Sequence, residues 1–220
     1  MKRTLIIIVL ALLNIATPAQ DYKGFHTLLD FYAGYSSKKD NSKFSAESFA
    51  VKSLQMPLTF GLNVSEGYQV LPNLFAGIGF GGYAVFANYK YDYSGNDNYS
   101  DEMSGRFIYF PFYVNARYTL NRNATVTPFA DVKFGYQVGI NLDAGDCMWE
   151  EKNNVFLSHR NSVYFVPTVG IRFGRAVGFN LGISYNPSVK MDITYFKDCQ
   201  MISRKKFTSG AFSLILGLDF

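Results

Sequence analysis

The two histidines of the chain, His26 and His159, are the first side chains to consider for chemistry. Nucleophilic catalysis needs a base beside a nucleophile and a third group that orients the base. His159 follows Ser158, and His26 is close to Asp30, but neither neighbourhood matches a known hydrolase motif. We therefore expect no catalytic residue and no enzymatic activity. The histidines also lack acidic or Cys neighbours at ligand spacing, so we expect no metal site.

A glycine-rich stretch offers a second candidate, because Gly77, Gly79 and Gly82 match the pattern GxGxxG. In a dinucleotide site that pattern follows a strand and opens a helix, whereas here the glycines lie within an alternating segment. We expect no bound cofactor. Gly77, Gly79 and Gly81 instead predict a smooth stripe on one face, which leaves room for large side chains opposite.

Six charged residues lie on the polar side of segments in which polar and apolar residues alternate. They are Asp30, Arg117, Asp131, Lys133, Arg172 and Asp219. Isolated charges in a narrow interior are costly, so three acids and three bases there are expected to pair. We predict a balanced network that fills the interior. For Asp219 and Arg172 the alternative is an unpaired place at a wet rim.

The segments that carry these residues are longer than the ~5 to 6 residues of a typical globular strand. Their period of two predicts β-strands with one apolar and one polar face. The clearest examples are residues 56–64, 108–118, 130–140 and 177–185. Less regular segments near 25–35, 74–88, 162–173 and 207–220 bring the prediction to eight strands, the smallest size of a membrane barrel.

The connections between these strands alternate in length. Short turns are predicted at 71–73, 121–123 and 174–176, and long polar connections near 36–53, 88–105, 143–160 and 188–205. A soluble sandwich or lipocalin-like barrel has no reason to keep its long loops at one end, but an outer-membrane barrel does. The polar faces are also poor in Lys and Glu, which suits a small lumen better than a wet exterior. We predict an all-β, eight-stranded, antiparallel up-and-down transmembrane β-barrel with short periplasmic turns and four long external loops.

The N-terminus has the three parts of a secretory signal peptide: Lys2 and Arg3, an apolar run from Leu5 to Leu13, and small residues in ATPAQ. We place the signal peptide at residues 1–19 and the barrel domain at 20–220. Without Lys2 and Arg3 the chain has 19 basic and 17 acidic residues, a balance that argues against nucleic acid as a partner.

The segment after the signal peptide resembles the small outer-membrane β-barrel domain family of Gram-negative bacteria, the eight-stranded porin-like type common in Bacteroidetes. The likeness lies in GYQVLPNLFAGIGFG (67–81), TPFADVKFGY (127–136) and the final FSLILGLDF (212–220). The final strand is similar to the signal that the barrel-assembly machinery reads, with one face formed by Phe212, Leu214, Leu216, Leu218 and Phe220. The resemblance implies outer-membrane residence with both termini periplasmic, and it implies no single biochemical activity.

Two features depart from a simple barrel pattern. Glu66 falls in phase with the lipid-facing side of its strand, where a carboxylate is costly, so we expect a bulge near 65–67 that turns Glu66 inward. Cys147 and Cys199 fall in the third and fourth long loops, on one side of the membrane. The envelope permits disulfides, so a Cys147 to Cys199 bridge and two free thiols are the open alternatives.

The long loops differ in charge: 36–53 and 188–206 are basic, and the second and third loops are acidic. They are expected either to pack on one another or to present the basic pair to lipopolysaccharide phosphates. Function is expected to reside in an envelope-structural or surface role of these loops, whose external ligand the sequence does not identify. A narrow porin-like pore is the alternative, and a lipid-modifying enzyme is the third hypothesis.

Overall fold

The computed structural model describes residues 24–36, 39–40, 44–46, 49–94, 98–141, 153–175, 177–197 and 200–220. Over these ranges the chain forms strands, turns and bends, and it contains no helix of the length and apolarity that crossing a membrane requires. The signal-peptide prediction for residues 1–19 lies outside the described residues.

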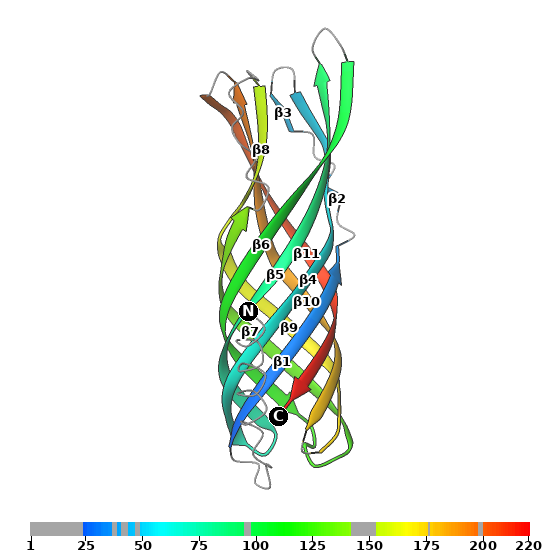
Figure 1. Cartoon of the computed structure of the whole chain (residues 1–220), viewed down its shortest axis with the longest axis vertical. Coiled ribbons are helices and arrows are strands. Elements are labelled where there is room, and N and C mark those ends of the chain that lie inside the picture. Colours follow the sequence, from blue (N-terminus) through cyan, green and yellow to red (C-terminus); the bar gives the residue numbers. More distant parts are fainter. Residues whose placement is uncertain are drawn as a thin grey trace, which may run out of the picture.

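Eight long strands form a closed ring (Figure 1). They are β1 (Phe25–Tyr35), β4 (Phe49–Leu71), β5 (Leu74–Ser94), β6 (Asn98–Thr119), β7 (Val126–Asn141), β9 (Ser162–Phe173), β10 (Gly178–Lys197) and β11 (Gln200–Asp219). Each strand pairs antiparallel with its neighbours in sequence, and β1 pairs with both β4 and β11. The prediction of an eight-stranded up-and-down barrel is therefore confirmed.

Three short strands, β2 (Lys39–Asp40), β3 (Phe44–Ala46) and β8 (Asn153–His159), lie in the long connections. The long strands also run further than predicted: β5 and β6 stay paired up to Ser94 and Asn98. Figure 1 shows these extensions rising above the barrel in two groups, while the short turns lie at the opposite end. We call these the loop end and the turn end. The backbone pairing of β5 with β6 therefore continues beyond the segments that the period of two predicts.

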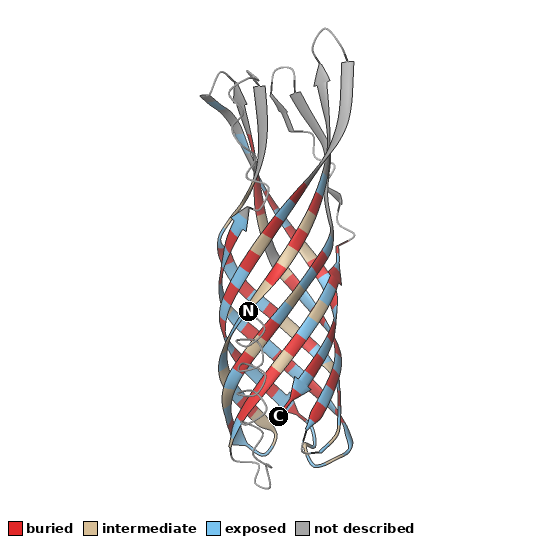
Figure 2. Cartoon of the chain, viewed as in Figure 1, coloured by how far each residue is buried: buried red, intermediate tan, exposed pale blue. Residues whose placement is uncertain are grey.

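The two faces of the ring have opposite chemistry, as the alternating colours in Figure 2 show. Outward side chains such as Phe112 and Val114 on β6 or Leu214 on β11 are large, apolar and more than half exposed. Inward side chains on the same strands, such as Asn115 and Arg117, are buried. This is the reverse of a water-soluble protein, in which the apolar face forms the core.

The turns at the turn end match the predicted positions. The β4–β5 turn is formed by residues 72–73 and the β6–β7 turn by 120–125, and the described residues between β9 and β10 are 174, 175 and 177. Gly174 has a φ of 101°, which side chains with a Cβ rarely adopt. Its amide donates to the carbonyl of Thr125, so this glycine also joins two turns to each other.

The bulge expected near Glu66 is absent, and that prediction is wrong. The pairing of β4 with β1 and with β5 runs without a register shift through this region. Glu66 is exposed on the outer face and accepts a hydrogen bond from Thr27 Oγ1 at 2.7 Å. A neighbouring hydroxyl donor therefore compensates the outward carboxylate, so the strand keeps its phase.

The hydrogen-bonded ladder between β9 and β10 is interrupted toward the loop end. Pairing runs from Phe179 and Phe173 up to Ser184 and Thr168, and β10 then pairs with β8 from Met191 onward. Pro167 and Pro187 flank this interruption, and proline has no amide hydrogen to donate to a ladder. β9 remains paired with β7 over the same stretch.

Candidate functional site

Four charged side chains meet inside the barrel and form what we call the central cluster: Asp30, Arg117, Asp131 and Lys133. Arg117 Nη2 lies 3.2 Å from Asp30 Oδ2 and 3.1 Å from Asp131 Oδ2. Lys133 Nζ lies 2.9 Å and 2.6 Å from the same two oxygens. All four side chains are at most 2% exposed. Two acids and two bases thus balance one another in the interior.

Strand register explains why these side chains meet. Arg117 on β6 is directly paired with Asp131 on β7, and Lys133 follows on the same inward face. Asp30 reaches them from β1, on another part of the wall. The Arg117 guanidinium also stacks over the ring of Phe129, 4.7 Å from its centroid. Every member of the cluster is a strand residue whose direction follows from alternation.

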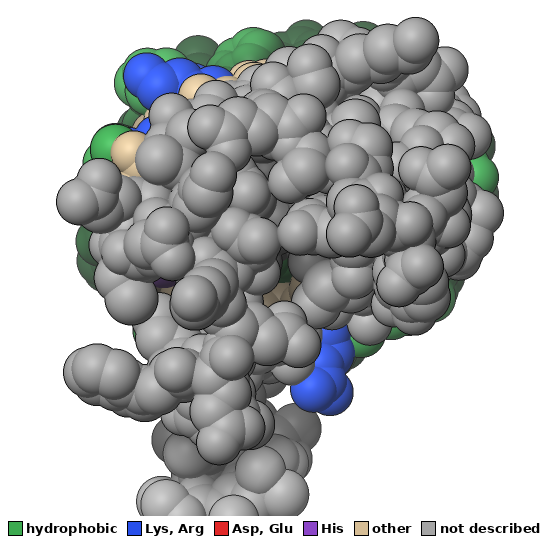
Figure 3. Space-filling model, turned by 90° about the horizontal axis from the view of Figure 1, so that it is seen from above, with side chains coloured by type: hydrophobic (Ala, Val, Ile, Leu, Met, Phe, Trp, Pro, Cys, Tyr) green, Lys and Arg blue, Asp and Glu red, His purple; other side chains and the backbone are tan. Residues whose placement is uncertain are grey.

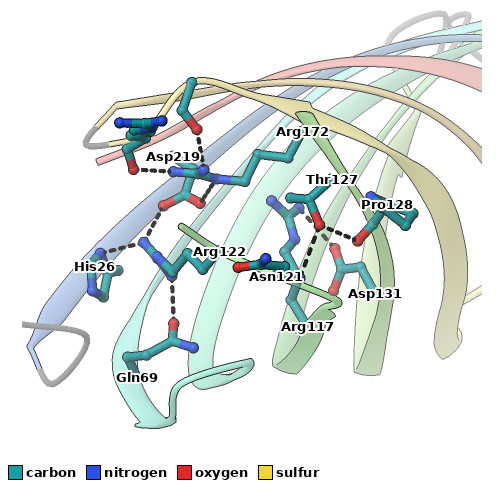
Figure 4. Close-up of polar contacts among 12 residues, drawn as sticks. His26, Gln69, Arg117, Asn121, Arg122, Thr127, Pro128, Asp131, Arg172 and Asp219 are labelled. Carbon is teal, nitrogen blue, oxygen red and sulfur yellow. Dashed lines mark hydrogen bonds and ion pairs between the residues drawn. The ribbon is translucent and has the colours of Figure 1, made fainter. Parts of the chain in front are cut away.

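A second group of polar side chains lies nearer the short turns, and we call it the turn-end cluster (Figure 4): His26, Gln69, Arg122, Arg172 and Asp219. Asp219 accepts from two arginines, through Oδ2 from Arg172 Nε at 2.9 Å and through Oδ1 from Arg122 Nη2 at 3.0 Å. Arg172 also donates to the carbonyls of Gly174 and Arg175. Arg172 and Asp219 are therefore paired and buried, not unpaired at a wet rim.

Arg122 is the member of this cluster that sequence reasoning missed. It belongs to the β6–β7 turn, and its side chain folds back into the barrel mouth. Its Nη1 donates to Gln69 Oε1 at 2.5 Å, and its Nη2 donates to His26 Nδ1 at 2.9 Å. Burial lowers the pKa of the Arg122 guanidinium from its ordinary value, and the Asp219 carboxylate opposes that effect. One turn residue thus connects β1, β4 and β11 across the opening.

Above the central cluster, toward the loop end, inward tyrosines fill the lumen. We call this group the tyrosine layer: Tyr32, Tyr83, Tyr109, Tyr113 and Tyr164. The rings of Tyr83 and Tyr109 stack with centroids 5.1 Å apart, and those of Tyr113 and Tyr164 are 5.5 Å apart. Tyr83 donates to Gln137 Oε1, and Asn63 donates to Tyr164.

Inward glycines make room for this layer, as their spacing predicts. A Cβ at Gly79 would collide with the Tyr113 ring, and one at Gly61 would collide with Tyr32 and Tyr83. The alternation on β6 already places Tyr109 and Tyr113 on the polar face, so the signal for the layer is present in the sequence. What the sequence does not show is that rings from four strands, β1, β5, β6 and β9, contact one another inside the barrel.

The loop end carries a further ion-paired group. Asp192 on β10 is buried and accepts two hydrogen bonds from Arg204, and Arg160 Nη1 lies 3.9 Å from its other oxygen. Arg204 and Lys206 are exposed on β11. Seen from above, Lys and Arg side chains show at two places on the edge of the described surface (Figure 3).

The other residues singled out in the sequence are those of the final strand, the two cysteines and the two histidines. Phe212, Leu214, Leu216 and Leu218 all face outward and are exposed, and Phe220 follows the end of β11. Cys147 and Cys199 lie outside the described residues, so their pairing stays a prediction. Within the described ranges no three His, Cys, Asp or Glu side chains come together as a metal site would need. His26 lies in the turn-end cluster, and His159 lies on β8, far along the chain from it.

Comparison with known proteins gives a likeness of fold. No family model and no curated protein matches the chain. Among solved structures, the outer membrane protein OprG from Pseudomonas aeruginosa matches with a TM-score of 0.54 and 12% identity over 90% of this chain and 96% of that one. Neisserial surface protein A matches with a TM-score of 0.46 and 15% identity over 89% of this chain and 95% of that one. The Escherichia coli outer membrane protease OmpT matches with a TM-score of 0.48 and 8% identity over 93% of this chain and 97% of that one. None of these matches supports the narrower, Bacteroidetes-type part of the resemblance.

Proposed function

We propose that the chain is an integral outer-membrane β-barrel protein with a closed lumen, which acts through its loop end and not as a channel or an enzyme. Its exterior is apolar around the ring, and its backbone groups are paired by closure of β1 on β11, as a bilayer interior requires. The fold it shares with OprG fits this placement. In this orientation the turn end and both termini lie in the periplasm, and the long loops lie outside.

The observation that carries the closed lumen is the central cluster. Side chains from β1, β6 and β7 meet there with no more than 2% exposure. An eight-stranded barrel is just wide enough for side chains to fill its interior. Aromatic rings above the cluster and guanidinium groups below it add two further layers. Three filled levels in series favour a scaffold over a pore.

The test is single-channel recording of the refolded protein in a planar bilayer, with gel mobility before and after boiling as the control for folding. We expect no discrete current steps from folded protein. Stable and reproducible steps would contradict the closed lumen and favour the alternative, a narrow pore for ions or small solutes. In that case Asp131 and Lys133 become the candidates for ion selectivity.

The non-enzymatic part of the proposal rests on the surroundings of the two histidines. His26 Nδ1 accepts from Arg122, and its Nε2 is buried without a partner. His159 Nδ1 is also buried without a partner. A triad histidine uses both ring nitrogens, one toward the nucleophile and one toward an acid. Lipid A and phospholipid hydrolysis assays on the wild type and a His26→Ala, His159→Ala variant test this: hydrolysis by the wild type that the variant loses would contradict it.

Lipopolysaccharide is the partner we propose for the loop end. Arg204 and Lys206 are exposed on β11, and β11 pairs with β1, the strand that precedes the basic residues 36–53 in the sequence. Phosphate groups favour such cationic side chains. A Lys206→Glu variant should bind lipopolysaccharide micelles more weakly than the wild type. Equal affinity of the two proteins would remove lipopolysaccharide phosphate as the partner.

A further inference from the structure

Glu66 is a charged side chain on the apolar outer wall of the barrel. From Leu58 to Val70 every second residue of β4 belongs to the outer face, and Glu66 is the one charged residue among them. Within the part of the chain that the structure describes, no Lys, Arg or His forms an ion pair with Glu66. An ionisable side chain that faces lipid is costly, so its presence there indicates a specific partner.

Strand register shows where on the wall this carboxylate lies. Glu66 pairs with Thr27 on β1 and with Ile78 on β5. In the next row toward the turn end Phe25 pairs with Tyr68, and their exposed rings meet edge to face with centroids 5.6 Å apart. Exposed tyrosine rings favour the boundary between lipid and water. Glu66 therefore lies one row inside that boundary, a distance of about 7 Å along the strand for two residues at ~3.3 Å each.

The carboxylate is held in a fixed position on the wall. Thr27 is 0% exposed, and its Oγ1 donates to Glu66 Oε1 at 2.7 Å. Glu66 itself is exposed, and a carboxylate accepts hydrogen bonds at both oxygens. The second oxygen, Oε2, is therefore available to a donor that approaches from the lipid side.

The surface beside Glu66 fits the rest of an amphiphilic molecule. Ile78 is 69% exposed, and Phe80, one row further toward the loop end, is 59% exposed. A fitting ligand has a cationic donor near the lipid–water boundary and hydrocarbon chains that run toward the membrane centre. A phospholipid with an ammonium headgroup has this form. In the orientation proposed above, the turn end lies in the periplasmic leaflet of the outer membrane, which consists of phospholipid.

We propose that Glu66 binds the primary ammonium group of phosphatidylethanolamine, whose acyl chains lie along Ile78 and Phe80. The ammonium donates to Oε2 and supplies the positive charge that the described side chains do not. The choline group of phosphatidylcholine has no N–H and cannot donate, so the site selects the primary ammonium. This lipid site is separate from the role of the loop end and does not depend on whether the lumen conducts.

The first test is native mass spectrometry of the refolded protein from nanodiscs that contain dioleoyl phosphatidylethanolamine and dioleoyl phosphatidylcholine in equal amounts. We expect the wild type to retain phosphatidylethanolamine about threefold or more over phosphatidylcholine, as a charge-assisted hydrogen bond at a partly wet site allows. Glu66→Gln keeps the shape of the side chain and should retain the two lipids equally. Glu102→Gln makes the same change on β6 at the loop end and should keep the wild-type ratio. A wild type without preference, or a Glu66→Gln variant that keeps it, contradicts the site.

A second test needs no variant. A carbodiimide joins a carboxylate to a primary amine in contact with it as an amide, and takes up the lost oxygen as a urea. In nanodiscs of phosphatidylethanolamine, we expect the wild-type protein to acquire a lipid on the peptide that contains Glu66, as mapped by mass spectrometry. Lipid attached to other carboxylates but not to Glu66 would overturn the proposal.

Discussion

The two charged clusters in the lumen differ in how they are built. The central cluster consists of strand residues, balances two acids with two bases and is fully enclosed. The turn-end cluster sets two arginines against one aspartate, and one of its arginines comes from a turn and remains 11% exposed. Strand register alone therefore positions the first cluster, whereas the second depends on how a turn folds back. We expect substitutions in the central cluster to lower the free energy of unfolding more than substitutions in the turn-end cluster.

The largest effect is expected from Lys133→Met in the central cluster. It leaves Asp30 and Asp131 enclosed with Arg117 as their only cation. Removing one partner of a buried ion pair typically costs about 3–5 kcal/mol. Urea unfolding of the refolded protein, followed by gel mobility, measures the free energy of unfolding.

A matched double variant shows whether charge balance is the cause. Asp131→Asn combined with Lys133→Met restores one acid to one base, so it should recover part of the loss. If the double variant loses as much free energy of unfolding as the two single variants lose in sum, lost packing explains the effect better than unbalanced charge.

An intermediate effect is expected from Asp219→Asn in the turn-end cluster. The change leaves Arg122 and Arg172 without a carboxylate, but Arg172 keeps the carbonyls of Gly174 and Arg175. We expect a loss of about 1–3 kcal/mol, the range for removing a partner of a buried polar group. The same unfolding assay measures it, and a loss larger than that of Lys133→Met would reverse the ranking of the clusters.

The smallest effect is expected from Arg122→Gln. The variant removes the contacts to Gln69, His26 and Asp219, but it also removes one of the two arginines that share Asp219, and Asp219 keeps Arg172. We expect a change of about 1 kcal/mol or less, since lost hydrogen bonds and relieved repulsion oppose each other. A loss as large as that of Asp219→Asn would mean that Arg122, and not Arg172, is the main partner of Asp219.

Most of the fold could be predicted from alternation and connection length. An apolar side chain on every second residue defines the outer face, and it placed all eight ring strands. The strand extensions at the loop end could not be predicted in this way, because the backbone pairing continues beyond the segments in which apolar residues alternate regularly. Glu66 shows a further limit: its phase is regular, but the Thr27 hydroxyl that accommodates it lies on a strand distant in sequence.

The same limit applies to the candidate site, in which strand side chains could be predicted and a turn side chain could not. The six charged residues of the predicted network all lie in the lumen, because each belongs to a strand whose polar face points inward. Arg122 could not be predicted, since a turn residue has no face assigned by period. The sequence predicts three acids and three bases in the lumen, whereas the two clusters contain three acids and four bases.

The most direct test of the closed lumen is the reactivity of a thiol placed between the two clusters. In a Cys147→Ser, Cys199→Ser background, Asn180→Cys puts a thiol at that level, and Thr208→Cys puts one on the exposed face of β11. A small charged thiol reagent should modify folded Thr208→Cys rapidly and leave folded Asn180→Cys unmodified until the protein unfolds. Modification of folded Asn180→Cys at the rate of Thr208→Cys would contradict the closure of the lumen.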